Sequence, residues 1–247
     1  MTASRPTILA TSAGYVPHRR LRFTFGPMMA LAVDLVAETG LVDGTRARIC
    51  NVGTASGDDS GFQRDMEEAA RDAGYVLHHL SLFSQPNVDD VEAYLRSFDV
   101  IWVNGGSVVN LLAVWRAHGL PEILRTLWQE GTVLGGISAG SLCWFQGGTT
   151  DSYGPDLAPV TDALGFLPYA NSVHHDSEDG RRPLMHRLVA DGTFAEAHCT
   201  DDGVGLVYRG TELSEAVTEK EGASAWRVRR EDDGSAVEEQ LPTRLLR

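Results

Sequence analysis

Short apolar runs alternate with longer segments of helical periodicity over roughly the first 145 residues of the chain. This alternation is typical of a parallel β-sheet whose connecting helices cover both faces. The runs that we expect to be strands include PTILATS (6–12), YVLHHLSLF (75–83), FDVIWVNGG (98–106) and TVLGGI (132–137). The sequence therefore predicts an α/β fold with a mainly parallel sheet between two helical layers.

The last hundred residues have a different pattern. A loop-rich stretch precedes a helix expected over 181–192, and strands follow it, with a possible hairpin around Asp233 and Gly234. We expect these strands to extend or flank the same sheet, so that residues 1–247 form one domain.

The net charge of −13 argues against a general affinity for nucleic acid or for anionic membrane surfaces. The three cysteines are far apart and lack the spacing of metal ligands, so we expect reduced thiols, no metal and no cofactor. The first 14 residues contain no long apolar run with a cleavage pattern behind it, and no stretch is long enough to span a membrane. We therefore expect a cytoplasmic protein.

One motif carries chemistry. Gly136-Ile137-Ser138-Ala139-Gly140 fits the pattern G-x-S-x-G and stands between a predicted strand and a segment, 138–145, that we expect to be helical. In a nucleophile elbow the serine adopts a strained backbone conformation, which small neighbours permit, at the N-terminus of a helix. The position between strand and helix makes Ser138 a candidate nucleophile.

A serine nucleophile needs a histidine base that a carboxylate orients. The pair His174-His175 lies in a polar loop downstream of Ser138, whereas most other histidines fall within predicted strands or helices. Asp151 lies between Ser138 and His174, which matches the order of the triad in α/β-hydrolases. However, an acid so soon after the serine leaves no room for the strands that normally intervene, so a different α/β fold is indicated.

The segments GGISAG (135–140), VNGGSVVNLL (103–112) and TDALGFLPYANSVHHD (161–176) resemble the dipeptidase E family of serine peptidases. That family is related to cyanophycinase and has a class I glutamine amidotransferase-like fold, a flavodoxin-like three-layer sandwich. The resemblance implies that Ser138 is the nucleophile and that His174, rather than His175, is the base. It also implies that the acid is Asp151, in the stretch Thr149-Thr150-Asp151. Asp176 is a rival acid, because related amidotransferases place a carboxylate two residues after their histidine.

The remaining site residues follow from acyl-transfer chemistry and from the substrate that the resemblance implies. Two backbone N–H groups must stabilise the oxyanion, and we expect them from Ala139 and from Gly106 or its neighbour Gly105. The resemblance implies cleavage of dipeptides with an N-terminal aspartate. Recognition of its carboxylate requires cationic donors, for which Arg181 and Arg182 are candidates.

Two other functions remain open. A cyanophycinase-like hydrolase of β-aspartyl-arginine peptides would differ only in the shape of its pocket. A non-catalytic or glutaminase-like module could use the same fold, although a glutaminase requires cysteine where this chain has Ser138. We expect a small peptide as the partner, no nucleic acid or membrane, and either a monomer or a homodimer.

Overall fold

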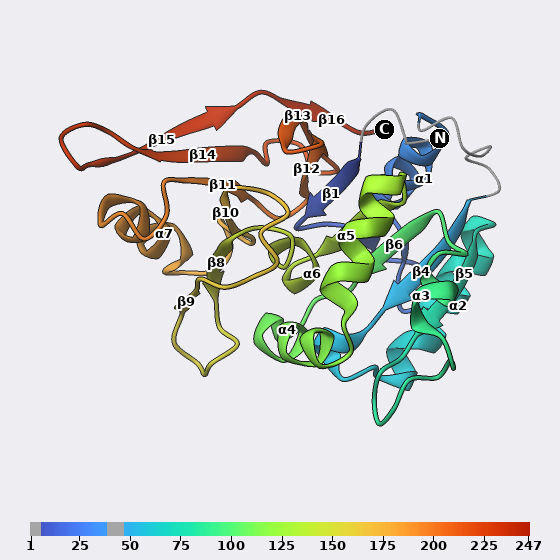
Figure 1. Ribbon diagram of the computed structural model, residues 1–247. Coiled ribbons are helices and arrows are strands. Elements are labelled where there is room, and N and C mark those ends of the chain that lie inside the picture. Colours follow the sequence, from blue (N-terminus) through green and yellow to red (C-terminus); the bar gives the residue numbers. More distant parts are fainter. Residues whose placement is uncertain (1–5, 39–46) are drawn as a thin grey trace.

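The main sheet is mixed and largely parallel in the computed structural model, which describes residues 6–38 and 47–247 (Figure 1). Residues 1–5, part of the stretch expected to carry no leader peptide, lie outside the described residues. Within the described residues the sheet has eight strands, in the spatial order β16 (Thr243–Leu245), β13 (Glu212–Thr218), β12 (Val204–Arg209), β1 (Thr7–Thr11), β7 (Val133–Ile137), β6 (Val100–Val103), β4 (Arg48–Val52) and β5 (Val76–Leu80). Five neighbouring strands are parallel, as predicted, in the order β1, β7, β6, β4 and β5. Strand β12 pairs with the other edge of β1 and is antiparallel to it.

Helices cover both faces of this sheet, as the apolar periodicity predicted. Successive side chains of a strand point to opposite faces, so Trp102 of β6 packs with one core cluster and Val103 with another. The helices that connect the parallel strands are α1 (Pro27–Glu38), α2 (Ser60–Ala73), α3 (Val91–Leu95), α4 (Val108–Ala117) and α5 (Leu120–Glu130), with the 3-10 turn η2 (Thr54–Ser56) before α2. The fold is therefore the expected class I glutamine amidotransferase-like α/β sandwich.

The helix expected over residues 138–145 is shorter than predicted. It forms α6 (Ala139–Leu142), after which Trp144 and Phe145 are fully buried in the core. The N–H of Gln146 then donates to the carbonyl of Tyr169 at 2.9 Å. Burial of these two aromatic side chains therefore overrides the local helical pattern.

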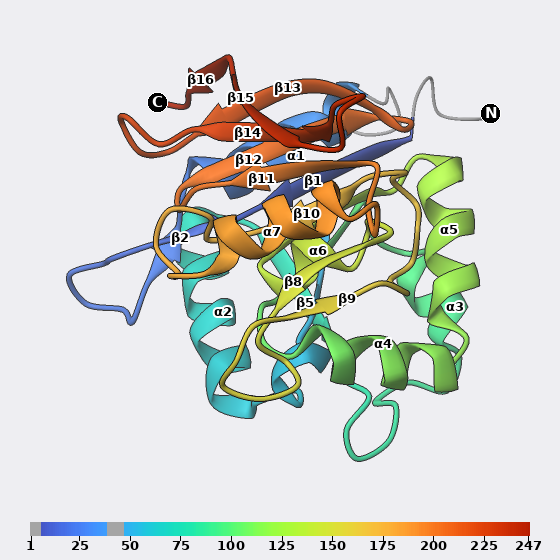
Figure 2. The ribbon, with the colours of Figure 1, turned by 90° about the vertical axis from the view of Figure 1, so that its left-hand side faces the viewer.

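A second sheet holds most of the remaining C-terminal strands (Figure 2). Its spatial order is β15 (Ala236–Leu241), β14 (Ala225–Arg230), β11 (Glu196–Thr200), β10 (Ala170–Ser172), β8 (Gly147–Thr150) and β9 (Ala158–Val160). Helix α7 (Arg181–Ala190) packs on it through Leu184, Met185 and Leu188. The expected hairpin forms from β14 and β15, but it joins this second sheet because β14 pairs with β11.

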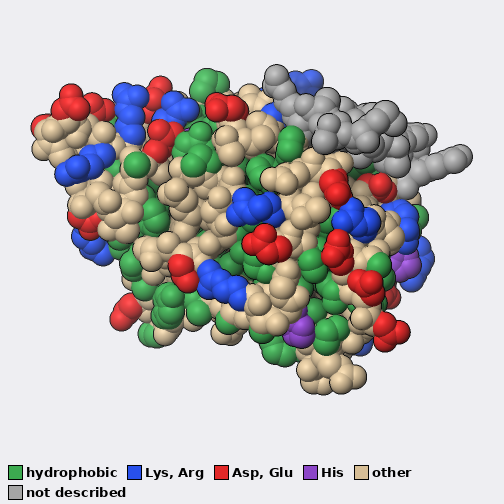
Figure 3. All heavy atoms as spheres, viewed as in Figure 1, with side chains coloured by type: hydrophobic (Ala, Val, Ile, Leu, Met, Phe, Trp, Pro, Cys, Tyr) green, Lys and Arg blue, Asp and Glu red, His purple; other side chains and the backbone are tan. Residues whose placement is uncertain are grey.

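A two-residue strand pair, β2 (Tyr15–Val16) and β3 (Thr24–Phe25), precedes α1. Acidic and basic side chains are interspersed over the face seen in Figure 3. In the described part of the chain, no helix combines the length and the apolar character that crossing a membrane requires.

Candidate active site

Ser138 occupies a sharp turn between β7 and α6. Its backbone has φ 58° and ψ −113°, in a region that residues other than glycine rarely adopt. Such a conformation costs about 1–3 kcal/mol and persists where the surroundings impose it. Here the N–H of Ser138 donates to the carbonyl of Thr11 at 3.0 Å, which continues the pairing of β7 with β1. The turn leaves Ser138 partly exposed at the carboxyl end of the sheet.

The two glycines of the motif are required by close packing against β6. A Cβ atom on Gly140 would stand 2.1 Å from the carbonyl oxygen of Val103, and one on Gly136 would stand 2.4 Å from the same atom. Any larger residue at either position would displace the elbow from its neighbouring strand.

His174 lies in the loop after β10, and its backbone also has a positive φ, of 52°. Its N–H donates to the hydroxyl of Ser12 at 3.2 Å. Because Thr11 pairs with Ile137, Ser12 and Ser138 are the residues that directly follow the ends of two adjacent strands. No hydrogen bond joins His174 to Ser138 within the described residues, but a catalytic bond of this kind often forms only when substrate binds.

Asp202 supplies the carboxylate that orients His174. Its Oδ1 lies 2.6 Å from Nδ1 of His174. Burial raises the pKa of Asp202, but the hydrogen bonds from His174 and Ser177 outweigh burial, and the net pKa lies below the usual value. A charged Asp202 accepts, so Nδ1 of His174 donates and Nε2 is free to act as a base.

The topology explains how Asp202 reaches this position. It lies between β11 and β12, and β12 runs antiparallel to β1. The start of β12 therefore meets the carboxyl ends of β1 and β7. The sequence analysis did not select Asp202, because β11, the strand before it, has the mixed sequence EAHCT and carries no distinct local signal.

Asp151, the acid that the resemblance implied, and its rival Asp176 make other contacts than Asp202 does. Asp176 accepts the backbone N–H of Asp202 at 2.8 Å, so it holds the acid loop rather than the imidazole. Asp151 is exposed, in a loop whose next residue, Ser152, accepts the N–H of Val108 at 3.0 Å. Among the described residues, no hydrogen bond links either carboxylate to His174.

Glycines at the end of β6 stand next to the nucleophile. A Cβ atom on Gly105 would lie 3.2 Å from Cβ of Ser138, whereas one on Gly106 would meet the carbonyl oxygen of Ala55 at 2.3 Å. The other expected oxyanion donor, Ala139, follows Ser138 and begins α6, where a backbone N–H has no partner within the helix. Gly105 and Ala139 are therefore both next to Ser138, whereas the oxyanion role of their N–H groups stays a prediction.

A pocket of about 430 Å³ opens over Ser138. It is lined by Tyr15, Arg22, Ser56, Asp59, Phe62, Asn104, Gly105, Ile137 and Ser138. Tyr15 donates its hydroxyl to Oδ1 of Asn104 at 2.7 Å and accepts from the Trp102 indole at 3.1 Å. Among the described residues the buried Nδ2 of Asn104 has no hydrogen-bond partner.

Arg181 and Arg182, the expected substrate-binding cations, do not line this pocket. Arg181 is buried, and its guanidinium donates to Glu178 and to the carbonyl of Thr149, both at 2.6 Å. Arg182 donates to Glu238 and stacks over the ring of Trp226 at 4.5 Å. Both arginines therefore support the loop of His174 and the second sheet. The arginine that does line this pocket is Arg22, which the sequence analysis did not select.

The described residues contain no group of three or more histidine, cysteine or acidic side chains arranged to hold a metal. Cys50, Cys143 and Cys199 are free and buried. Burial raises the pKa of Cys143, which disfavours the thiolate that a nucleophile needs.

Comparisons with known proteins identify the family of this chain. The model of Peptidase family S51 matches residues 35–216. The uncharacterized peptidase YgaJ of Bacillus subtilis (strain 168) is 40% identical over 181 residues, which cover 73% of this chain and 77% of that protein.

Two solved structures share the fold. A peptidase from an acI-B1 Actinobacterium has a TM-score of 0.69 at 16% identity, over 97% of this chain and 95% of that one. A Listeria monocytogenes EGD-e protein named as a peptidase E has a TM-score of 0.57 at 13% identity, over 97% of this chain and all of that one. From the family match and the Bacillus relative together, the chain belongs to peptidase family S51, the dipeptidase E family.

Proposed function

We propose that this peptidase is a serine-type dipeptidase that hydrolyses dipeptides with an N-terminal aspartate through an acyl-enzyme on Ser138. The observation that carries the proposal is the strained backbone of Ser138 at the end of β7. The neighbouring strand β1 leads into Ser12, whose hydroxyl accepts the N–H of His174. His174 is in turn bonded to the charged Asp202. These are the three roles that acyl transfer by a serine requires.

In this mechanism Oγ of Ser138 attacks the peptide carbonyl while Nε2 of His174 takes its proton. The N–H groups of Ala139 and of Gly105 or Gly106 stabilise the oxyanion. The tetrahedral intermediate collapses as His174 returns the proton to the leaving amine, and an aspartyl ester remains on Ser138. Water, deprotonated by His174, then attacks the ester, and aspartate is released as His174 returns the proton to Oγ of Ser138. Asp202 stabilises the imidazolium that forms in both steps.

Selectivity for aspartate is assigned to Arg22 and Asn104. Arg22 lines the pocket and pairs at 2.9 Å with Asp65, and its side chain is 65% exposed. An exposed ion pair of this kind contributes little, so Arg22 can exchange Asp65 for a substrate carboxylate at small cost. Asn104 also lines the pocket, and its Nδ2, which has no partner among the described residues, is the uncharged donor that we assign to the substrate.

A screen of Asp-Leu, Glu-Leu, Asn-Leu, β-Asp-Leu and β-Asp-Arg tests the proposal. We expect release of free aspartate from Asp-Leu and loss of that activity in Ser138→Ala. Ser56→Ala is the matched control, because Ser56 lines the same pocket and its hydroxyl donates to the Gly53 carbonyl at 3.0 Å. Cleavage of β-Asp-Arg instead of Asp-Leu would favour the cyanophycinase-like alternative. Hydrolysis of none of the five would favour a non-catalytic module.

A further inference from the structure

Both members of the His174–Asp202 pair have a buried polar neighbour in the chain. His175 follows His174, and Asp201 precedes Asp202. Neither neighbour takes part in the proposed chemistry, and both are buried. Both contact the β14–β15 hairpin, which lies beyond residues 35–216 that match the family model.

The first contact joins His175 to β15. Nε2 of His175 lies 2.8 Å from Oε1 of Glu238, and its Nδ1 lies 3.2 Å from the hydroxyl of Ser172. The other oxygen of Glu238 accepts from Arg182. Burial raises the pKa of Glu238, but the hydrogen bond from His175 and the charge of Arg182 help to bring it below the usual value. A charged Glu238 thus fixes the side chain of His175, which follows His174 in the chain.

The second contact joins Asp201 to β14. Its N–H donates to the carbonyl of Ser224 at 3.1 Å. Its carboxylate accepts the N–H of Ser224 and the indole N–H of Trp226, each at 3.0 Å. Three hydrogen bonds therefore fix the residue that precedes Asp202.

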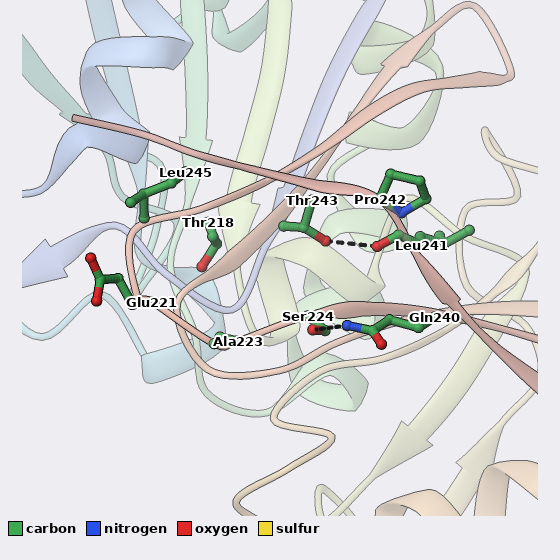
Figure 4. A pocket seen from close by; sticks show the side chains of 10 residues that line it. Thr218, Glu221, Ala223, Ser224, Gln240, Leu241, Pro242, Thr243 and Leu245 are labelled. Atoms are coloured by element: carbon green, nitrogen blue, oxygen red, sulfur yellow. Dashed lines mark hydrogen bonds between the residues drawn. The ribbon is translucent and has the colours of Figure 1, made fainter.

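The base of the hairpin is itself closed by side chains. A hollow of about 520 Å³ lies there. The amide of Gln240 donates to the hydroxyl of Ser224 at 2.7 Å, a bond drawn as a dashed line in Figure 4. This hydrogen bond connects β15 to Ser224, whose backbone is bonded to Asp201. The two contacts with the acid and base loops thus belong to one connected unit.

We infer that the β14–β15 hairpin is a positioning element of the active site, in which Glu238 and Trp226 hold His174 and Asp202 in register with Ser138. The inference rests on the proposed function, since it assigns these residues to that reaction. The two residues act through His175 and Asp201 and do not touch substrate. Displacement of a catalytic group by about 1 Å can cost about 100-fold in rate, so loss of either contact is measurable.

Trp226→Phe is the sharpest test, because it retains an aromatic ring beneath Arg182, changes no charge and removes one of the two donors to the Asp201 carboxylate. We expect kcat for Asp-Leu to fall by about 5- to 30-fold with KM within about 2-fold, because the substrate pocket is built from other elements. Glu238→Leu should lower kcat similarly, and Glu238→Gln, which keeps an acceptor for His175, should restore part of the loss. Val237→Thr is the matched control, since Val237 is the exposed neighbour of Glu238 on the same strand.

Melting temperatures and far-UV circular dichroism of all four variants separate positioning from folding. Reduced kcat in Trp226→Phe at temperatures where that variant is fully folded supports the inference. Wild-type kcat in Trp226→Phe and in a folded Glu238→Leu would overturn it, as would a rise in KM alone. If Glu238→Leu does not fold, Trp226→Phe decides the question. Absence of Asp-Leu hydrolysis in the wild type would instead refute the proposed function.

Discussion

Replacement of Asp202 by asparagine removes the charge that faces His174 and retains the size of the side chain. Oδ1 of Asp202 lies 2.6 Å from Nδ1 of His174, and the two side chains are 40% and 20% exposed. In the proposed mechanism this carboxylate stabilises the imidazolium of each transition state. Asparagine can also offer the imidazole an NH2 group, which would favour the wrong tautomer.

The expected loss follows from Coulomb's law. Charge centres about 4 Å apart interact by about 4 kcal/mol at an effective dielectric constant of about 20. The exposure of Asp202 to solvent reduces this to between about 2 and 4 kcal/mol. Because each 1.36 kcal/mol corresponds to about tenfold in rate, kcat should fall by about 30- to 1000-fold.

Asp176→Asn and Asp151→Asn are the matched comparisons. The amide oxygen of an asparagine at 176 can still accept the N–H of Asp202, and Asp151 is exposed, so each variant should stay within about 5-fold of the wild type. Initial rates with saturating Asp-Leu, normalised to folded protein, measure all three. A greater loss in Asp151→Asn or Asp176→Asn than in Asp202→Asn would refute the assignment of the acid.

Gly105→Ala should lower kcat by about tenfold or more without unfolding the protein, because its methyl group would stand 3.2 Å from Cβ of Ser138; wild-type turnover would contradict this. Arg22→Gln should raise KM for Asp-Leu about tenfold and leave kcat nearly unchanged, and an unchanged KM would exclude Arg22 from substrate binding. Burial raises the pKa of Asp58, so the folded protein binds this proton more strongly than the unfolded chain does. The free energy of unfolding that this group contributes therefore declines as pH rises through the raised pKa. Asp58→Asn should therefore gain melting temperature relative to the wild type between about pH 4 and pH 7, and a constant difference would contradict this sign.

The parallel part of the fold and the elbow could be predicted because their signals are local. Buried strands such as β6 are continuous apolar runs, and the glycines around Ser138 follow from contacts with the adjacent strand. Ser138 follows β7 and His174 donates to Ser12, which follows the adjacent β1, but the catalytic roles of both residues remain predictions.

The acid and the second sheet could not be predicted in the same way. Asp202 meets His174 only because β12 runs antiparallel to β1, a pairing between distant segments that no local pattern encodes. The hairpin sequence favours two strands but does not determine their neighbour, and β14 pairs with β11 rather than with the main sheet. Arg22 was missed because its loop shows no periodicity and reaches the pocket only through the tertiary fold.

The central claim is that Ser138 forms the acyl-enzyme. Acid quenching of the wild-type protein during turnover of aspartyl p-nitroanilide, followed by peptide mapping by mass spectrometry, tests it most directly. We predict an added aspartyl group on the peptide that carries Ser138, and none in Ser138→Ala. An aspartyl adduct on another residue, or undiminished hydrolysis by Ser138→Ala, would contradict the account.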